Sequence, residues 1–299
     1  ENVFVGYYAG KTTTGIANVF LGKDAGSTVT SGCYNIALGR DALGDGAGTT
    51  GNSNIAMGYS SGEKMTSGNN NFFAGYFAGG SVTTGANNVV FGNTAGKNVG
   101  AGENNVFIGE NAGKSSGTAA DNNASDNIAI GKDSGLALTT GSNNVFLGHG
   151  AGETETDGNS HIFIGYRAGR CRAGNGSIAI GNQALVGLST QASNTGVCNI
   201  GIGYHAGCGI TSGCSNIILG TNTAKCLTTG KDNIYMGNEV GPISNTATGG
   251  CNVVLGYNAA NAFTTAEQNF IYGYDAGRYM TEGAYNILMG SISGNQLTT

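Results

Sequence analysis

The stretch "NVFLGKDAG" occupies residues 18–26, and close variants of these nine letters recur along the whole chain. The recurring core is a pentad, Asn-h-x-h-Gly, in which h is an apolar residue. It begins seventeen units, at residues 2, 18, 35, 54, 71, 88, 105, 127, 144, 161, 177, 199, 216, 233, 252, 269 and 286. Ten of the sixteen intervals are 17 residues, two are 16, two are 19 and two are 22. So short a period indicates a repeat architecture built from small stacked units.

We call each position of the unit a slot and number the slots from the Asn. Each slot is occupied by only a few residue types. Slot one is Asn in fifteen units and His161 or Ser177 in the other two, whereas slot five is Gly in all seventeen. Slots two and four are apolar, and because side chains alternate along a strand they share one side of it. We expect that side to face the interior of a narrow coil. Segments such as "GSVTTG" (80–85) are expected to form a second short strand and a second turn.

The composition favours an ordered all-β chain over a disordered one. The 299 residues include 56 Gly, one Pro and no Trp, and 39% of them are hydrophobic, with a net charge of −5. Disorder is typical of chains with few apolar residues and a high net charge. A helical solenoid is excluded because no segment has a 3.6-residue period. The sequence therefore predicts a parallel β-solenoid of about 17 coils, formed by residues 1–299 as a single repeat array. Since repeat text reaches both ends, we expect a segment of a longer fibre protein.

Slot three is expected to point away from the interior, yet it is apolar throughout. An apolar stripe along a whole repeat array is too large to leave in water, so we expect other copies of the chain to cover it. Rotational symmetry about a shared axis makes a homotrimer the preferred assembly, and an end-to-end polymer is also open. The alternative is that slot three packs inside a wider single coil. The predicted oligomer seam consists of Phe4, Phe20, Phe73, Phe107, Phe146, Phe163, Tyr235 and Ile271.

Three segments carry a resemblance to a known family. "NIALGRDA" (35–42), "NIAIGKDS" (127–134) and "SIAIGNQA" (177–184) closely resemble the head repeats of trimeric autotransporter adhesins of the Yersinia adhesin type. Similar Gly-rich repeats occur in phage tail fibres. The resemblance implies a left-handed parallel β-roll that assembles as a homotrimer and serves attachment outside a cell or virion. The present repeats are longer than the usual adhesin-head repeat, and residues 1–299 contain no neck, stalk or membrane-anchor pattern, so we expect a fibre shaft or a detached segment.

Two features are candidates for contacts with a receptor or a glycan. Tyr follows the Gly of slot five in seven units, as Tyr7, Tyr59, Tyr76, Tyr166, Tyr204, Tyr257 and Tyr274. Such side chains could stack on sugars, or simply cover the backbone beside the turn. Extra residues lengthen coils 3, 7, 11 and 14, within residues 44–53, 114–126, 185–198 and 242–250. In solenoids such insertions form surface loops, which either bind partners or are tolerated drift.

The sequence offers no catalytic constellation. None of the three His belongs to a triad or lies beside paired carboxylates, and no cofactor motif, metal site or membrane-spanning stretch is present. The seven Cys match no zinc spacing, so they are either small buried fillers or bridges between neighbouring coils, such as Cys198 with Cys214. The mild acidity without basic clusters argues against nucleic-acid binding. Paired threonines, as at residues 83–84 and 139–140, leave ice binding as an alternative.

The predicted function is therefore structural and adhesive rather than enzymatic. We expect a rigid extracellular fibre, on a cell or virion surface, that attaches to an unknown receptor or glycan. The alternatives are a viral or phage tail-fibre shaft and a self-polymerising filament of the extracellular matrix.

Overall fold

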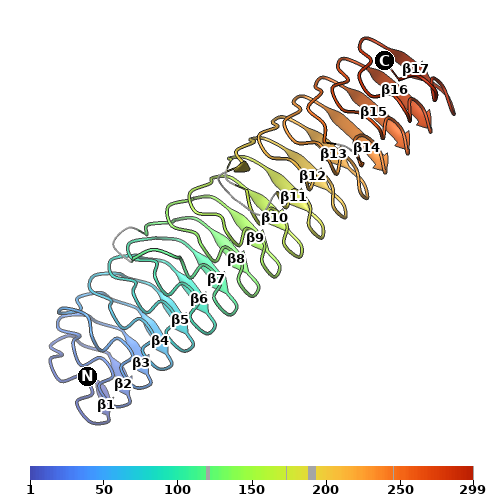
Figure 1. The fold of residues 1–299 in the computed structure, drawn as a ribbon. Coiled ribbons are helices and arrows are strands. Elements are labelled where there is room, and N and C mark those ends of the chain that lie inside the picture. Colours follow the sequence, from blue (N-terminus) through green and yellow to red (C-terminus); the bar gives the residue numbers. More distant parts are fainter. Residues whose placement is uncertain (119–121, 173, 188–192, 245, 299) are drawn as a thin grey trace. The chain divides into compact units, whose positions relative to one another are not determined.

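In the computed structural model, which describes residues 1–118, 122–172, 174–187, 193–244 and 246–298, the chain is all-β and forms a parallel β-solenoid. It divides into two compact units, Glu1–Asp157 and Gly158–Thr299. Each sequence repeat supplies one strand, so coil and strand numbers coincide. Within each unit the strands lie side by side as the coils stack (Figure 1). The described residues include no helix able to span a membrane.

The strands are short, and each covers slots two to four, or two to six in three coils. In the first unit they are β1 (Val3–Val5), β2 (Val19–Leu21), β3 (Ile36–Leu38), β4 (Ile55–Met57), β5 (Phe72–Ala74), β6 (Val89–Phe91), β7 (Val106–Ile108), β8 (Ile128–Ile130) and β9 (Val145–Leu147). In the second unit they are β10 (Ile162–Ile164), β11 (Ile178–Ile180), β12 (Ile200–Ile202), β13 (Ile217–Leu219), β14 (Ile234–Asn238), β15 (Val253–Tyr257), β16 (Phe270–Tyr274) and β17 (Ile287–Met289).

Equivalent slots are in register between successive coils. Between β2 and β3, for example, Val19 pairs with Ile36 and Phe20 with Ala37, and all the pairings are parallel. The expected second strand is largely replaced by irregular backbone. Among the described residues it is represented by isolated bridges, such as the one between Val29 and Thr49. Each coil thus has one regular strand, and the rest of its backbone bonds to the next coil through turns.

Slot three lies in the interior, contrary to the expectation that it faces outward. The side chains of Phe20, Phe73, Phe107, Phe146, Phe163, Tyr235 and Ile271 are at most 1% exposed, while Phe4 in the first coil is 36% exposed. These residues therefore form the core of the coils and are not a surface seam. The alternative in which slot three packs inside a single coil is confirmed. By the same alternation, slots two and four point outward.

The Asn side chains of slot one explain this orientation. Asn18 is 1% exposed, and its Nδ2 donates to the carbonyl of Gly32 at 2.9 Å, which closes its own coil. Its Oδ1 accepts the backbone N–H of Asn35, the slot-one residue of the next coil, at 2.8 Å. Slots one and three share a side of the strand, so an inward Asn requires an inward slot three. The amide can be buried because its polar atoms are hydrogen-bonded.

Glycine is required where successive coils approach each other closely. Gly22, in slot five, has a φ of 137°, and a Cβ there would lie 2.5 Å from the carbonyl oxygen of Gly39 in the next coil. Gly26 has a φ of 58° and lies against the ring of Phe20, where a Cβ would again be only 2.5 Å away. Any larger side chain at either position would separate the coils or displace the core ring.

Two coils of the second unit use a different residue in slot one and keep its acceptor role. His161 is fully buried, and its Nδ1 accepts the backbone N–H of Ser177 at 3.2 Å. The Oγ of Ser177 in turn accepts the N–H of Asn199 at 3.3 Å. A serine cannot supply the coil-closing amide donor, and here the buried guanidinium of Arg172 donates to the carbonyl of Gly196 instead. A second nitrogen of Arg172 donates to the carbonyl of Ile210 at 3.2 Å.

We predict that Asn88→Ala destabilises the fold by about 3 kcal/mol, because it leaves buried partners without their hydrogen bonds. Asn88 donates to the carbonyl of Gly102 at 2.9 Å and accepts the N–H of Asn105 at 3.0 Å. The measurement is the free energy of unfolding in denaturant. Asn93→Ala removes the same group at an exposed position and should change stability by less than about 0.5 kcal/mol. Equal losses in the two variants would contradict the role of the ladder.

We also predict that acid weakens the second unit through His161. Burial, and then the charge of Arg172, lowers the pKa of His161 from 6.5 to about 4. The unfolded chain therefore takes up this proton near pH 6.5 and the folded chain only near pH 4, so the free energy of unfolding decreases across that range, by about 3 kcal/mol. Denaturant unfolding at pH 7, 5.5 and 4 measures the change. His161→Asn should reduce the dependence, whereas His149→Asn, at an exposed position, should not.

Candidate functional site

The side chains of slots two and four form an apolar face on each unit, which we call the outer apolar face. Its members that are more than a third exposed in the first unit are Val3, Val5, Leu21, Met57, Phe72, Val89, Phe91, Ile128 and Ile130. In the second unit they are Ile162, Ile202, Met236, Phe270, Tyr272, Ile287 and Met289. No position in these two slots is charged.

The face exists because the strands are in register. Stacking places each slot directly beside its counterpart in the next coil, as with Leu21 and Leu38, so two apolar residues per coil become two continuous columns within each unit. Exposed apolar patches larger than a few hundred Å² are uncommon on monomeric proteins and mark interaction surfaces. The face is therefore a candidate interface. Sequence reasoning found an apolar stripe but assigned it to the wrong slot.

The seven predicted tyrosines are all exposed, from 38% for Tyr59 and Tyr166 to 63% for Tyr7. In β15 and β16 the strand extends to slot six, so Tyr257 and Tyr274 lie on the same side as the outer apolar face. Their rings stack on each other with centroids 5.4 Å apart and planes 4° apart. The tyrosines thus border the apolar face in these coils and present hydroxyl groups along its rim.

Stacking limits how these rings could bind a sugar. Tyr59 and Tyr76 stack with centroids 5.4 Å apart, and the Arg40 guanidinium lies over the Tyr59 ring at 5.6 Å. Phe77 contacts Tyr76 edge-on at 4.7 Å. Because a sugar stacks on an open aromatic face, these contacts cover part of the surface that it would need. The tyrosines remain predicted surface contacts, with their edges and hydroxyls as the accessible parts.

The first threonine of a pair, as in 83–84 and 139–140, uses its hydroxyl within the fold. Thr83 donates to the carbonyl of Gly100 at 3.2 Å, and Thr139 donates to that of Thr156 at 3.0 Å. Each bond joins one coil to the next. The second threonines of these pairs, Thr84 and Thr140, are exposed, so ice binding stays an untested alternative.

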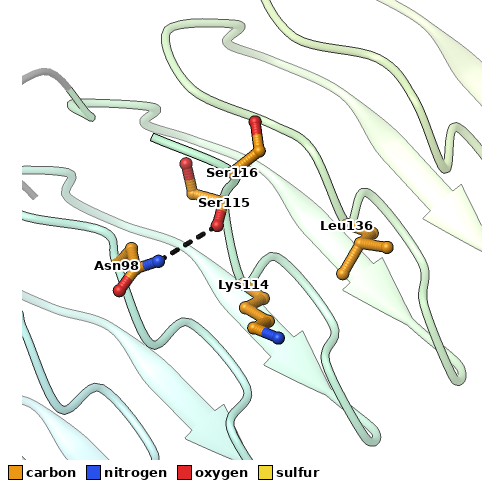
Figure 2. A pocket seen from close by; sticks show the side chains of 5 residues that line it. All are labelled: Asn98, Lys114, Ser115, Ser116 and Leu136. Carbon is orange, nitrogen blue, oxygen red and sulfur yellow. Dashed lines mark hydrogen bonds between the residues drawn. The ribbon is translucent and has the colours of Figure 1, made fainter. Parts of the chain in front are cut away.

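A cavity of about 320 Å³ lies at the insertion of coil 7, one of the four lengthened coils. Asn98 of coil 6, Lys114, Ser115 and Ser116 of coil 7, and Leu136 of coil 8 line it, as Figure 2 shows. The side chain of Asn98 donates to the carbonyl of Ser115 at 3.2 Å, which joins two of the coils beside the cavity. Parts of the other predicted loops, residues 188–192 and 245, lie outside the described residues, as do residues 119–121 of this insertion.

The titratable side chains form surface pairs, such as Lys132 with Glu110 at 3.1 Å, rather than larger clusters among the described residues. The described part of the chain contains no group of three His, Cys, Asp or Glu residues that could hold a metal ion. Nε2 of His149 lies 3.8 Å from a carboxylate oxygen of Asp133, and the ring of His205 stacks on Tyr204 at 4.0 Å. Neither pair lines the cavity at coil 7.

All seven cysteines are free, so the possible bridge between Cys198 and Cys214 is not formed in the structure. The stacking gives the reason. The backbone N–H of Ser215 donates to the carbonyl of Val197, which places Cys198 beside Ser215 rather than beside Cys214. Cys198 and Cys251 are exposed, Cys171 is buried, and the others are half-buried.

These features define the class of the protein as a parallel β-solenoid repeat protein with an exposed apolar sheet face. No protein-family model matches the chain, and no curated protein matches it.

We predict that unreduced chain in denaturant takes up seven iodoacetamide adducts, measured by intact mass, because every thiol is free. In the folded chain Cys198 and Cys251 should react first. Cys208 should react slowly, because burial raises the pKa of its thiol to about 11 and the thiolate is the reactive form. Fewer than seven adducts in denaturant would show that a bridge forms in solution.

Proposed function

We propose that this chain is the self-associating shaft of an extracellular fibre, whose work is structural and adhesive. The observation that carries the proposal is the outer apolar face, whose two columns follow the strands of each unit. Copies of the chain are its natural occupants, because every copy presents the same face and closed rotational symmetry lets identical faces cover one another. A parallel, threefold arrangement is the form that the resemblance to adhesin-head repeats implies.

The interior of the fold suits a mechanical role. Buried amides join each coil to the next, as the Asn88 side chain does when it accepts the N–H of Asn105 at 3.0 Å. The stability of such repeats is a sum of local units and nearest-neighbour interfaces, so a long array can be extended without a larger core. Backbone that is hydrogen-bonded on both sides also resists local opening and hence proteolysis. These properties favour a load-bearing shaft over a catalyst.

An attachment role would fall to the surface features outside the apolar face. The tyrosine rim and the lengthened coils place polar and aromatic groups where a receptor could reach them. Extracellular display on a cell or virion follows from the same resemblance and from the fibre role itself. The proposed partners are therefore other copies of the chain and a surface receptor or glycan.

We predict that the triple variant Leu21→Lys, Met57→Lys and Phe91→Lys is monomeric where the unchanged chain sediments as a trimer. The three side chains are 41–55% exposed and belong to slot four of coils 2, 4 and 6. Burying unpaired ammonium groups in an apolar interface is strongly unfavourable. Sedimentation equilibrium at about 10 μM, a concentration at which a stable interface of micromolar or better affinity is occupied, measures the mass.

The matched control carries three lysines on a different column, Thr50→Lys, Thr84→Lys and Thr140→Lys, all at exposed positions. It should sediment like the unchanged chain, since it adds the same charge away from the apolar face. A monomeric unchanged chain would refute self-association. Equal dissociation of the two triple variants would move the interface away from the outer apolar face.

A further inference from the structure

Strand β16 carries three outward aromatic side chains, Phe270, Tyr272 and Tyr274, which we call the β16 aromatic row. They occupy slots two, four and six, and they are 40%, 52% and 54% exposed. No other coil has aromatic residues in all three of these slots. β16 pairs with β15 on one side and with β17 on the other, so neighbouring coils flank the row and still leave it exposed (Figure 1).

The sheet is wider at this row than in the other coils of the second unit. Strands β14, β15 and β16 each extend to slot six, where Tyr257 pairs with Tyr274. The outward side of these coils therefore has three columns of side chains instead of two. The ring of Tyr274 stacks on that of Tyr257 with centroids 5.4 Å apart, which supports one end of the row. From slot two to slot six the row is about 13 Å long, at about 3.3 Å per residue.

The side chains of the row match a neutral sugar. None of the residues in slots two, four and six of coils 14 to 17 is charged. Tyr272 is the only residue with a hydroxyl in slots two and four of the whole chain, so this part of the outer apolar face differs from the rest. Aromatic rings pack against the C–H faces of sugar rings, and the phenol hydroxyls of Tyr272 and Tyr274 can both donate and accept hydrogen bonds. A purely apolar partner would cover these hydroxyls without satisfying them.

The area of the row favours a single glycan chain over a protein. A buried aromatic side chain contributes about 150–250 Å², so three rings exposed by about half offer on the order of 300 Å². A stable interface between proteins needs about 800 Å² on each partner. A row one strand wide is instead covered by one extended sugar chain. Sugars joined by β-1,4 linkages suit it best, because they form a flat ribbon with C–H groups on both faces.

We propose that the β16 aromatic row binds a neutral β-1,4-linked glycan of the glucan or chitin type. The rings of Phe270 and Tyr272 stack on sugar rings, and the hydroxyls of Tyr272 and Tyr274 bond to sugar hydroxyls. This inference deepens the attachment role proposed above and rests on it for its biological meaning. It also limits the interface between copies, because the row stays uncovered while copies cover the aliphatic parts of the outer apolar face.

The test is a calorimetric titration of the full chain with cellohexaose and with chitohexaose, which distinguish the two sources of the glycan. We expect saturable binding of at least one of them. It should be at least tenfold tighter than that of maltohexaose, whose α-linkages prevent a flat ribbon, and than that of hexagalacturonate, which is charged.

The variants separate the aromatic rings from general apolar character. The double variant Phe270→Val and Tyr272→Leu keeps slots two and four apolar, so it should fold and yet bind at least tenfold more weakly. Tyr272→Phe keeps the ring and removes the hydroxyl, and it should bind severalfold more weakly. The matched control, Phe72→Val and Phe91→Leu, removes exposed rings from the same two slots in the first unit and should keep the affinity. Unchanged circular dichroism and unfolding midpoints would show that the variants fold.

Several outcomes would overturn the proposal. They are the absence of saturable binding of either hexasaccharide, equal affinities of the two double variants, unchanged affinity of Tyr272→Phe, and equally tight binding of maltohexaose or hexagalacturonate. If the double variant in β16 changes the sedimenting mass and leaves glycan binding unchanged, the row belongs to the interface between copies and the assignment is wrong. The triple lysine variant changes coils 2, 4 and 6 and should still bind the glycan, so failure of self-association and failure of this site are separate results.

Discussion

The buried Asn ladder is the interaction on which the rest of the structure depends. Each Asn side chain makes two kinds of hydrogen bond. Its amide nitrogen donates to a carbonyl of its own coil, and its oxygen accepts a backbone N–H of the next coil. In coil 4, Nδ2 of Asn54 donates to Gly68 at 2.9 Å while its Oδ1 accepts the N–H of Asn71 at 3.0 Å. Both bonds are made away from water, where an unmade hydrogen bond would be costly. The ladder therefore links each coil to the next alongside the buried slot-three side chains.

The exceptions at coils 10 and 11 show what the ladder requires. His161 and Ser177 retain an acceptor for the next N–H, which is the bond that joins coils. The donor that closes a coil need not come from slot one, since the guanidinium of Arg172, in another coil, donates to the carbonyl of Gly196. A buried arginine is costly unless its donors are used, and here two of its nitrogens bond to carbonyls. The arginine also affects His161, whose pKa is lowered by burial and by the arginine's charge.

Much of this fold could be predicted from the sequence, because a 17-residue period with invariant Gly leaves few architectures open. Hydrophobicity could not predict which slots face the interior, since slots two, three and four are all apolar. The slot-one Asn, such as Asn18, determines the orientation. Its amide is buried because it bridges two coils, and slot three lies on the same side of the strand and so also faces inward. The sequence analysis placed slots two and four inside because they are apolar and largely β-branched, and this assignment reversed the faces. The cavity at coil 7 was foreseen only as a lengthened loop, because an unsatisfied hydroxyl such as that of Ser115 is a property of three-dimensional packing.

Once it is known which slots face the interior, the slot of a residue determines which property a substitution changes. Slots one and three face the interior, so changes there act on stability, as the burial of Phe107 and Asn105 implies. Slots two and four face outward, and a charge there leaves the coil intact while altering what the surface can bind. The backbone hydrogen bonds of a strand do not depend on apolar side chains. Apolar residues on the exposed face therefore need an explanation other than strand formation. A covering surface would supply that cause, and this is the argument for proposing the two outward apolar columns, slot two rich in Val and Ile and slot four in Leu, Ile and Met, as an interface.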